Sequence, residues 1–133
     1  MGARTKARKR AVDVLFEADQ RGLAPLAVLE AEGQRSDRTL NPYTLVLVGG
    51  VVERLAEIDA LLAIHSVEWP VDRMPAVDRA ILRLGTYELL WGEDLPPAVA
   101  IDEAVELAKG LSTDDSPGFV NGVLGKIAVN PPG

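Results

Sequence analysis

Residues 112–124 contain the side chains best suited to hold a ligand, in the order STDDSPGFVNGVL. The pattern predicts a loop that turns into a helix, with Ser116 as the cap and Pro117 at the first helical position. The unpaired N–H groups and the dipole at such a helix start attract anions. Phe119 in the first turn offers a ring on which a nucleobase can stack. Taken alone, these residues favour the alternative, a capped core helix whose Phe119 points inward.

The basic N-terminus is a second candidate site. Its cations are Arg4, Lys6, Arg8, Lys9 and Arg10, and residues 1–10 contain no acid. Five cations in seven positions can track the phosphates of a nucleic acid. A solvated tail is the alternative, but the apolar residues that follow indicate the start of a docked helix. We expect these cations to lie beside Phe119 and to form with it a site for single-stranded RNA.

The sequence offers little for catalysis. Among 133 residues there is one histidine, His65, and no cysteine, which excludes a disulfide, a thiolate nucleophile and a cysteine–zinc site. Asp114 and Asp115 are adjacent carboxylates, but acids before a helix usually serve its cap and dipole. The pair Gly49–Gly50 lacks the lysine and the spacing of a phosphate-binding loop. We expect no enzyme, no cofactor and no metal.

Charge and hydropathy indicate where the protein works. The formal net charge is −6, although the first ten residues are purely basic, so one edge of an acidic body is expected to face a polyanion. No apolar run is long enough to span a bilayer, and the basic N-terminus leads into no secretory segment. We expect a cytoplasmic protein without membrane contact.

The elements that position these residues are predicted to be helices throughout, since apolar residues recur at helical spacing. Residues 45–48 alone could form a buried strand, but no partner strand is evident. Helices are expected over 5–21, 25–32, two within 42–63 that break near 55–57, then 75–92, 100–109 and 117–128, with a loop over 33–40 and a tail over 130–133. A connector with two prolines divides the chain. We expect one domain over 1–133, with an N-terminal helical half 4–66, a connector 67–74 and a C-terminal helical half 75–129.

Four blocks of sequence together resemble one family. They are RKRAVDVLF at 8–16, VDRAILR at 77–83 with YEL at 87–89, VAIDEAVELAK at 99–109, and DS at 115–116 with FVNGVL at 119–124. Each block alone is weak, but their order and their coverage of most of the chain are specific. The chain resembles the NusB family of transcription antitermination factors.

The resemblance implies an all-α, NusB-like fold of about seven helices in two small bundles. It implies binding to boxA-type single-stranded RNA in nascent ribosomal-RNA transcripts, together with NusE, a small-subunit ribosomal protein. That pair helps to load an RNA polymerase elongation complex that resists termination.

The resemblance also assigns roles by position. RNA contacts are expected from Arg4, Lys6, Arg8, Lys9 and Arg10, and from Asp115, Ser116 and Phe119. Contacts to NusE are expected from Asp78, Arg83 and Glu88. Pro117 and Gly118 stand where many relatives carry polar or basic residues, so one phosphate contact is expected to be missing there.

Two other functions stay open at this point. One is a homodimeric helical interaction module without RNA binding, and the choice between monomer and homodimer is open with it. The other is the RNA-binding accessory domain of an rRNA cytosine methyltransferase, although we expect no catalytic domain beyond Gly133. An unrecognised hydrolase is a more distant third.

Overall fold

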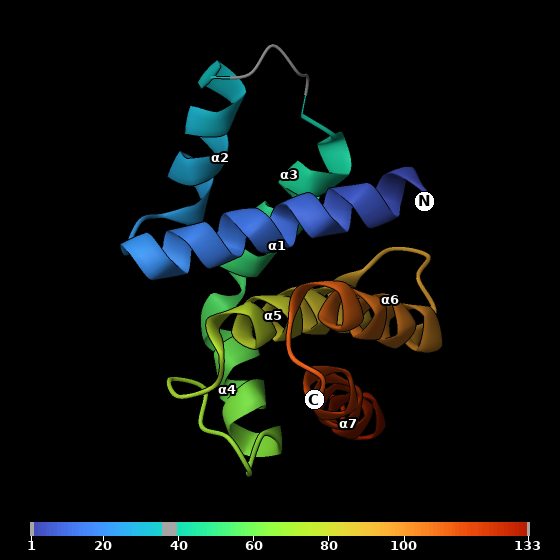
Figure 1. The fold of residues 1–133 in the computed structure, drawn as a ribbon. Helices are drawn as coiled ribbons and strands as arrows, with labels where there is room; N and C mark the ends of the chain where they lie inside the picture. The colour runs from blue at the N-terminus through green and yellow to red at the C-terminus, as the bar shows by residue number, and fades with distance from the viewer. Residues whose placement is uncertain (1, 36–39, 133) are drawn as a thin grey trace.

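The computed structural model describes residues 2–35 and 40–132, and this part of the chain forms seven α-helices and no strand (Figure 1). The helices are α1 (Ala3–Arg21), α2 (Pro25–Arg35), α3 (Pro42–Glu53), α4 (Leu55–His65), α5 (Ala76–Trp91), α6 (Pro97–Leu111) and α7 (Ser116–Val129). The prediction of an all-α fold with about seven helices is confirmed, and residues 45–48 are helical.

Local sequence signals explain several helix ends. Gly22 ends α1 in the left-handed region at φ 64°, and its N–H donates to the Ala18 carbonyl, which is the usual role of glycine at a helix C-terminus. Asn41 begins α3, because its side chain accepts a hydrogen bond of 2.8 Å from the Tyr43 N–H and Pro42 follows it. Both ends agree with the sequence prediction.

Two helix boundaries differ from the prediction, the end of α2 and the start of α6. Helix α2 continues through Gly33 to Arg35, since one interior glycine weakens a helix by only about 1 kcal/mol and need not end it. The rest of the loop expected over 33–40, residues 36–39, and the tail residue Gly133 lie outside the described residues. Helix α6 begins at Pro97 and not near residue 100, because proline is well tolerated in a first helical turn.

Helix α5 is the centre of the fold. It packs against α1, α3, α4, α6 and α7, and its Ile81, Leu82 and Leu84 are fully buried. The cluster of buried apolar side chains around it includes residues from all seven helices. Gly85 lets α6 and α7 approach α5 closely, since a Cβ there would lie 2.9 Å from the Leu124 side chain and 3.2 Å from the Ala104 Cβ. A rigid core therefore fixes the ends of α1, α6 and α7 relative to one another.

No helix in the described part of the chain is both long and apolar enough to cross a bilayer.

Candidate nucleic-acid interface

The cationic end of α1 divides into exposed and buried side chains. Arg4, Lys6 and Lys9 are exposed. Arg10 is half-exposed and forms an ion pair of 2.9 Å with Glu32 of α2. Arg8 is only 3% exposed. Three of the five predicted cations therefore face solvent without an ion pair in the described structure, and two are committed to carboxylates.

Arg8 belongs to a buried polar cluster, which corrects the expectation of a free RNA-binding side chain. Its Nε lies 2.8 and 3.0 Å from the two carboxylate oxygens of Glu88 on α5, and its guanidinium lies 3.4 Å from Glu103 on α6. The Tyr43 hydroxyl donates to the same Glu88 carboxylate. Arg8 faces inward because it precedes Val12 and Leu15 on one side of the helix. This spacing is the signal in the sequence that would have placed it correctly.

Burial and charge shift two pKa values in this cluster. Burial alone would lower the pKa of Arg8, but the hydrogen bond and the charge of Glu88 outweigh it and raise that pKa. Burial, followed by the hydrogen bond to Glu88 and its charge, raises the pKa of Tyr43 to about 12. Arg8 thus stays charged, and its charge is neutralised inside the protein.

Tyr43 also holds the exposed end of α1. The Arg4 guanidinium lies over the Tyr43 ring, 4.4 Å from its centre, which is a favourable cation–π geometry. Tyr43 is in the first turn of α3, so α3 contacts both the buried Arg8 and the exposed Arg4. The end of α1 is therefore a docked cationic surface and not a free tail.

The start of α7 contains a second buried cluster, around Asp78 of α5. Asp78 and Ser116 are each 1% exposed, and the Ser116 hydroxyl donates a 2.9 Å hydrogen bond to Asp78. The Ser112 hydroxyl donates to the other carboxylate oxygen. Ser116 is the first helical residue and Asp115 takes the cap position without a side-chain cap bond, so the predicted capping role of Ser116 is wrong. A carboxylate from α5 secures the loop instead.

Phe119 agrees with neither simple expectation. It is half-buried, and its ring meets Trp69 of the connector edge to face, with ring centres 5.7 Å apart. The two rings line a hollow of about 350 Å³ together with Asp115 and Thr113. Phe119 thus packs against the core on one side and contributes to an open aromatic surface on the other. Trp69, which is 40% exposed, was missed as a candidate because the connector showed no regular pattern.

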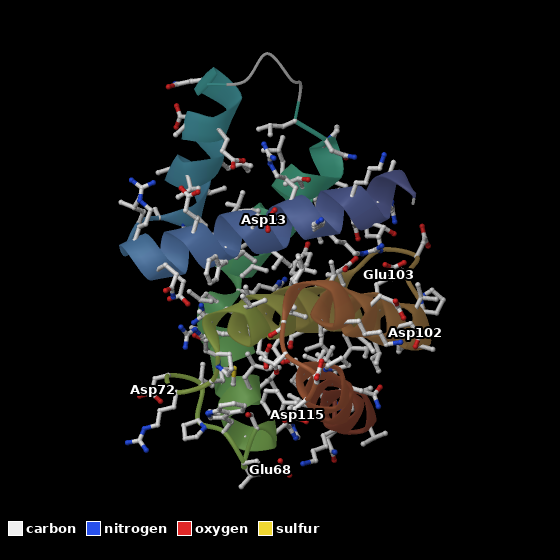
Figure 2. All side chains as sticks on the ribbon, in the orientation of Figure 1. Asp13, Glu68, Asp72, Asp102, Glu103 and Asp115 are labelled. Carbon is white, nitrogen blue, oxygen red and sulfur yellow. The ribbon has the colours of Figure 1, made fainter. Side chains whose placement is uncertain are left out.

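The cationic end of α1 and the start of α7 are not side by side, contrary to the sequence prediction. Helix α6 shares a groove with α1 and packs against α7, so that it lies between them in Figure 1. Figure 2 shows Glu103 beneath the N-terminal part of α1, whereas Asp115 lies with α7 on the other side of α6. A groove lined by Thr5 and Lys9 of α1 and by Leu107 and other residues of α6 connects the two regions. An interface that uses both regions has to cross α6.

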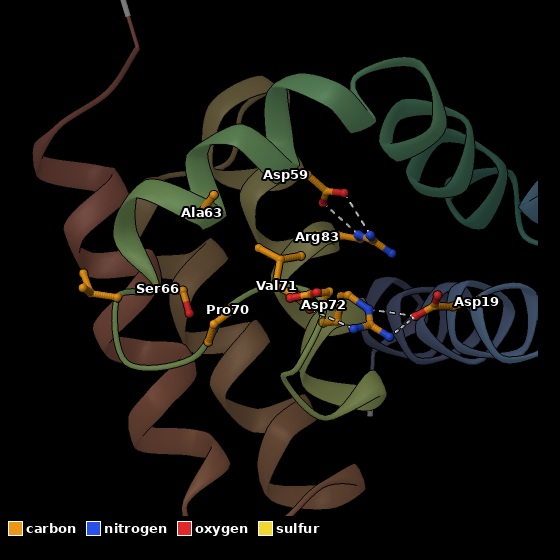
Figure 3. Close-up of a pocket in the computed structure, with 10 residues that line it drawn as sticks. Asp19, Asp59, Ala63, Ser66, Pro70, Val71, Asp72 and Arg83 are labelled. Atoms are coloured by element: carbon orange, nitrogen blue, oxygen red, sulfur yellow. Dashed lines mark hydrogen bonds and ion pairs between the residues drawn. The ribbon is translucent and has the colours of Figure 1, made fainter.

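The residues expected to contact NusE also separate into buried and accessible groups. Asp78 and Glu88 are buried in the two clusters above, so their carboxylates do not form an outer surface, and this part of the expectation is corrected. Arg83 forms two hydrogen bonds of 2.9 Å with Asp59 of α4. It lines an open cavity of about 740 Å³ beside Asp19 and Asp72, at the junction of α1, α4 and the connector (Figure 3).

Comparison with known proteins identifies the family. The model of the NusB family matches residues 5–129. The chain belongs to the NusB family. The transcription antitermination protein NusB of Saccharopolyspora erythraea is 62% identical over 130 residues, which are 96% of this chain and 88% of the relative. The NusB of Kineococcus radiotolerans is 59% identical over 128 residues, covering 96% of this chain and 94% of the relative.

Solved NusB structures share the fold. T. maritima NusB superposes with a TM-score of 0.85 at 35% identity, covering 96% of this chain and 92% of that one. A crystal structure of the antitermination factors NusB and NusE in complex with dsRNA matches with a TM-score of 0.83 at 31% identity, covering 96% of both chains. The predictions of a NusB-like fold and of a transcription antitermination factor are confirmed.

Proposed function

We propose that this chain is a cytoplasmic antitermination factor that binds boxA-type single-stranded RNA of nascent rRNA transcripts together with NusE. The complex would act on the RNA polymerase elongation complex, and the chain itself would catalyse no reaction. The observation that carries the proposal is the exposed cationic end of α1, rigidly docked on a protein whose net charge is −6. A protein similar to this chain has been solved with NusE and dsRNA, which supports the same choice of partners.

The exposed residues would contact different parts of the RNA. Arg4, Lys6 and Lys9 would contact phosphates, and Arg10 would join them where phosphate competes for its ion pair with Glu32. Phe119 would stack with a base beside Trp69. Asp115, which is exposed, would accept hydrogen bonds from a base edge.

The buried members of the predicted RNA site would act indirectly. Arg8 would hold the angle of α1 through Glu88, and Ser116 would hold the start of α7 through Asp78. Neither side chain needs to touch RNA to matter for binding, because both fix the surfaces that do.

NusE is proposed to dock at the cavity that Arg83 lines. Asp19, Asp59 and Asp72 lie at this cavity, and carboxylates suit the basic surface that is typical of a ribosomal protein. Two of them already pair with arginines of α5, Asp19 with Arg79 and Asp59 with Arg83. A basic side chain of the partner would replace Arg79 or Arg83 in these ion pairs. The free energy lost would be modest because the pairs are partly exposed.

A salt-controlled titration tests the proposed function. Fluorescently labelled boxA RNA and a scrambled RNA of equal composition are titrated with the full chain, with NusE present and absent. We expect tighter binding of boxA and a further gain with NusE. Equal affinities for both RNAs that NusE leaves unchanged would refute the proposal, and a stable dimer that never engages RNA would favour the homodimeric module instead.

A further inference from the structure

The groove between α1 and α6 is a site to which the proposed function gives no role. It has a volume of about 530 Å³, which lies in the range of small-molecule sites. We propose that it holds one unpaired nucleobase of the bound RNA, specifically a base with an amino group on its pairing edge. The inference rests on the proposed RNA-binding function and adds to it a subsite that reads a base.

The position of the groove favours an RNA occupant. One wall carries Thr5, which stands between the exposed cations Arg4 and Lys6, and the exposed Lys9. The other wall ends at Leu111, directly before the loop that leads to the start of α7. An RNA that contacts both the cationic end of α1 and Phe119 has to cross α6. The groove lies along this path.

The floor of the groove suits the flat face of a base. Leu107 is 6% exposed and Leu111 is half-buried, so both present apolar surface to the hollow. Gly110 lies between the wall residues without a side chain, and no atom lies within 4 Å of the position that its Cβ would take. A planar ring can therefore rest against the helix at this point, as single-stranded bases do against apolar and aromatic surfaces.

The rim explains why the occupant is a base and not a phosphate. Glu103 and Glu106 line the groove and would repel a phosphate placed inside it. The Glu103 carboxylate already lies 3.4 Å from Arg8 and accepts a hydrogen bond of 3.4 Å from Thr5. Glu106 pairs with Lys109 at 3.0 Å, and its side chain is 66% exposed. Exposed pairs of this kind are weak, so Glu106 is free to turn toward the groove.

A carboxylate selects among bases by their donors. Amino groups on the edges of guanine, cytosine and adenine donate to Glu, as in carboxylate contacts to cytosine N4. Uracil offers a single N–H between two carbonyls, whose oxygens face a carboxylate unfavourably. Lys9, which is exposed on the α1 wall, would pair with the phosphate of the same nucleotide. The groove therefore predicts a preference for an amino-bearing base at one position of the RNA.

The experiment fills the groove with a side chain. Gly110→Met places a methionine in open space on a helix, where methionine is favoured over glycine, so the variant is expected to melt no lower than the parent. Gly49→Met is the matched control, because Gly49 is also helical with no atom within 4 Å of its Cβ position and lies on α3, outside the groove. The probes are the labelled boxA RNA and a series of copies. Each copy carries a single abasic nucleotide, at a different position.

We expect the parent and Gly49→Met to lose at least fivefold in affinity at one abasic position that lies between the phosphate and stacking contacts. Gly110→Met is expected to bind intact RNA at least fivefold more weakly and to be insensitive to that same abasic position. Glu106→Gln is expected to weaken binding when the position carries an amino-bearing base and to leave binding of the uracil-substituted RNA unchanged.

The possible failures are distinguishable. If the parent binds no single-stranded RNA, the proposed function fails. If the parent binds RNA and Gly110→Met binds every probe with the same affinity as the parent, only the groove assignment fails. If Gly110→Met keeps its RNA affinity and loses NusE, the groove takes a protein segment, which also overturns the assignment.

Discussion

Removing the Arg8 guanidinium is expected to destabilise the fold far more than an ordinary surface substitution. Arg8→Met keeps an unbranched apolar stem in place of the arginine's aliphatic part but leaves the Glu88 carboxylate, which is 1% exposed, without its cation. Loss of one partner from a buried ion pair typically costs about 3–5 kcal/mol. For a chain of 133 residues, that loss lowers Tm by about 10–20 °C.

The assay is urea unfolding followed by circular dichroism. Arg21→Met is the matched control, because Arg21 pairs with Glu17 at 3.0 Å while its side chain is 60% exposed, and such a pair contributes about 1 kcal/mol or less. The double variant Arg8→Met, Glu88→Leu is expected to recover part of the loss, since replacement of both partners by apolar side chains removes the unpaired buried charge.

RNA binding provides the second readout for Arg8. Glu88 neutralises Arg8 in the free protein, so Arg8 releases no counterion when RNA binds. At a temperature where Arg8→Met is folded, its affinity for RNA falls while the slope of log affinity against log salt stays the same. If the variant is as stable as Arg21→Met and its slope is shallower by about 0.7, Arg8 contacts a phosphate in solution and the reasoning is wrong.

Three further predictions concern the exposed cations of α1, the Phe119 ring and the Tyr43 hydroxyl. Replacing Arg4 and Lys9 by alanine is expected to make the salt slope shallower by about 0.7 for each phosphate of the single strand that is no longer neutralised, measured by fluorescence titration; an unchanged slope would make both cations bystanders. Phe119→Ala is expected to weaken RNA binding by about 1–3 kcal/mol with helicity intact by circular dichroism, and equal affinity would remove the ring from the site. Tyr43, whose folded pKa of about 12 exceeds its ordinary value of 10.0, is expected to stabilise the fold fully below about pH 10 and to lose that contribution as the pH rises toward 12. Urea unfolding of the parent and of Tyr43→Phe across this range measures the free energy of unfolding at each pH. Parallel curves of this free energy against pH would contradict the prediction.

The order of helices was predictable because it rests on local patterns. Apolar spacing indicates the helices, Gly22 ends α1 and Asn41–Pro42 begins α3, each from its own neighbourhood. An interior glycine and a proline in a first helical turn are less decisive signals, because the glycine costs only about 1 kcal/mol and the proline is well tolerated there. For this reason, α2 continued through Gly33 and α6 began at Pro97.

The site was only half predictable, because charge alone does not tell where a side chain points. The five cations of residues 4–10 look alike in charge. Helical spacing with Val12 and Leu15 indicates that Arg8 faces inward, but its partner is a glutamate 80 residues away. Asp78 and Ser116 are 38 residues apart and likewise become partners only in the folded chain. Contacts at such separations depend on helix packing, which no local pattern in this sequence specifies.

The most direct test of the central claim is photo-crosslinking of the folded chain to boxA RNA that carries 4-thiouridine at single positions, with the linked peptides identified by mass spectrometry. We expect links to the first ten residues from one end of the RNA and to the surface around Trp69 and Phe119 from the other. Links confined to α2 and α3 would contradict the proposed interface. Links to the first ten residues alone, or to the Trp69–Phe119 surface alone, from every RNA position would also contradict it.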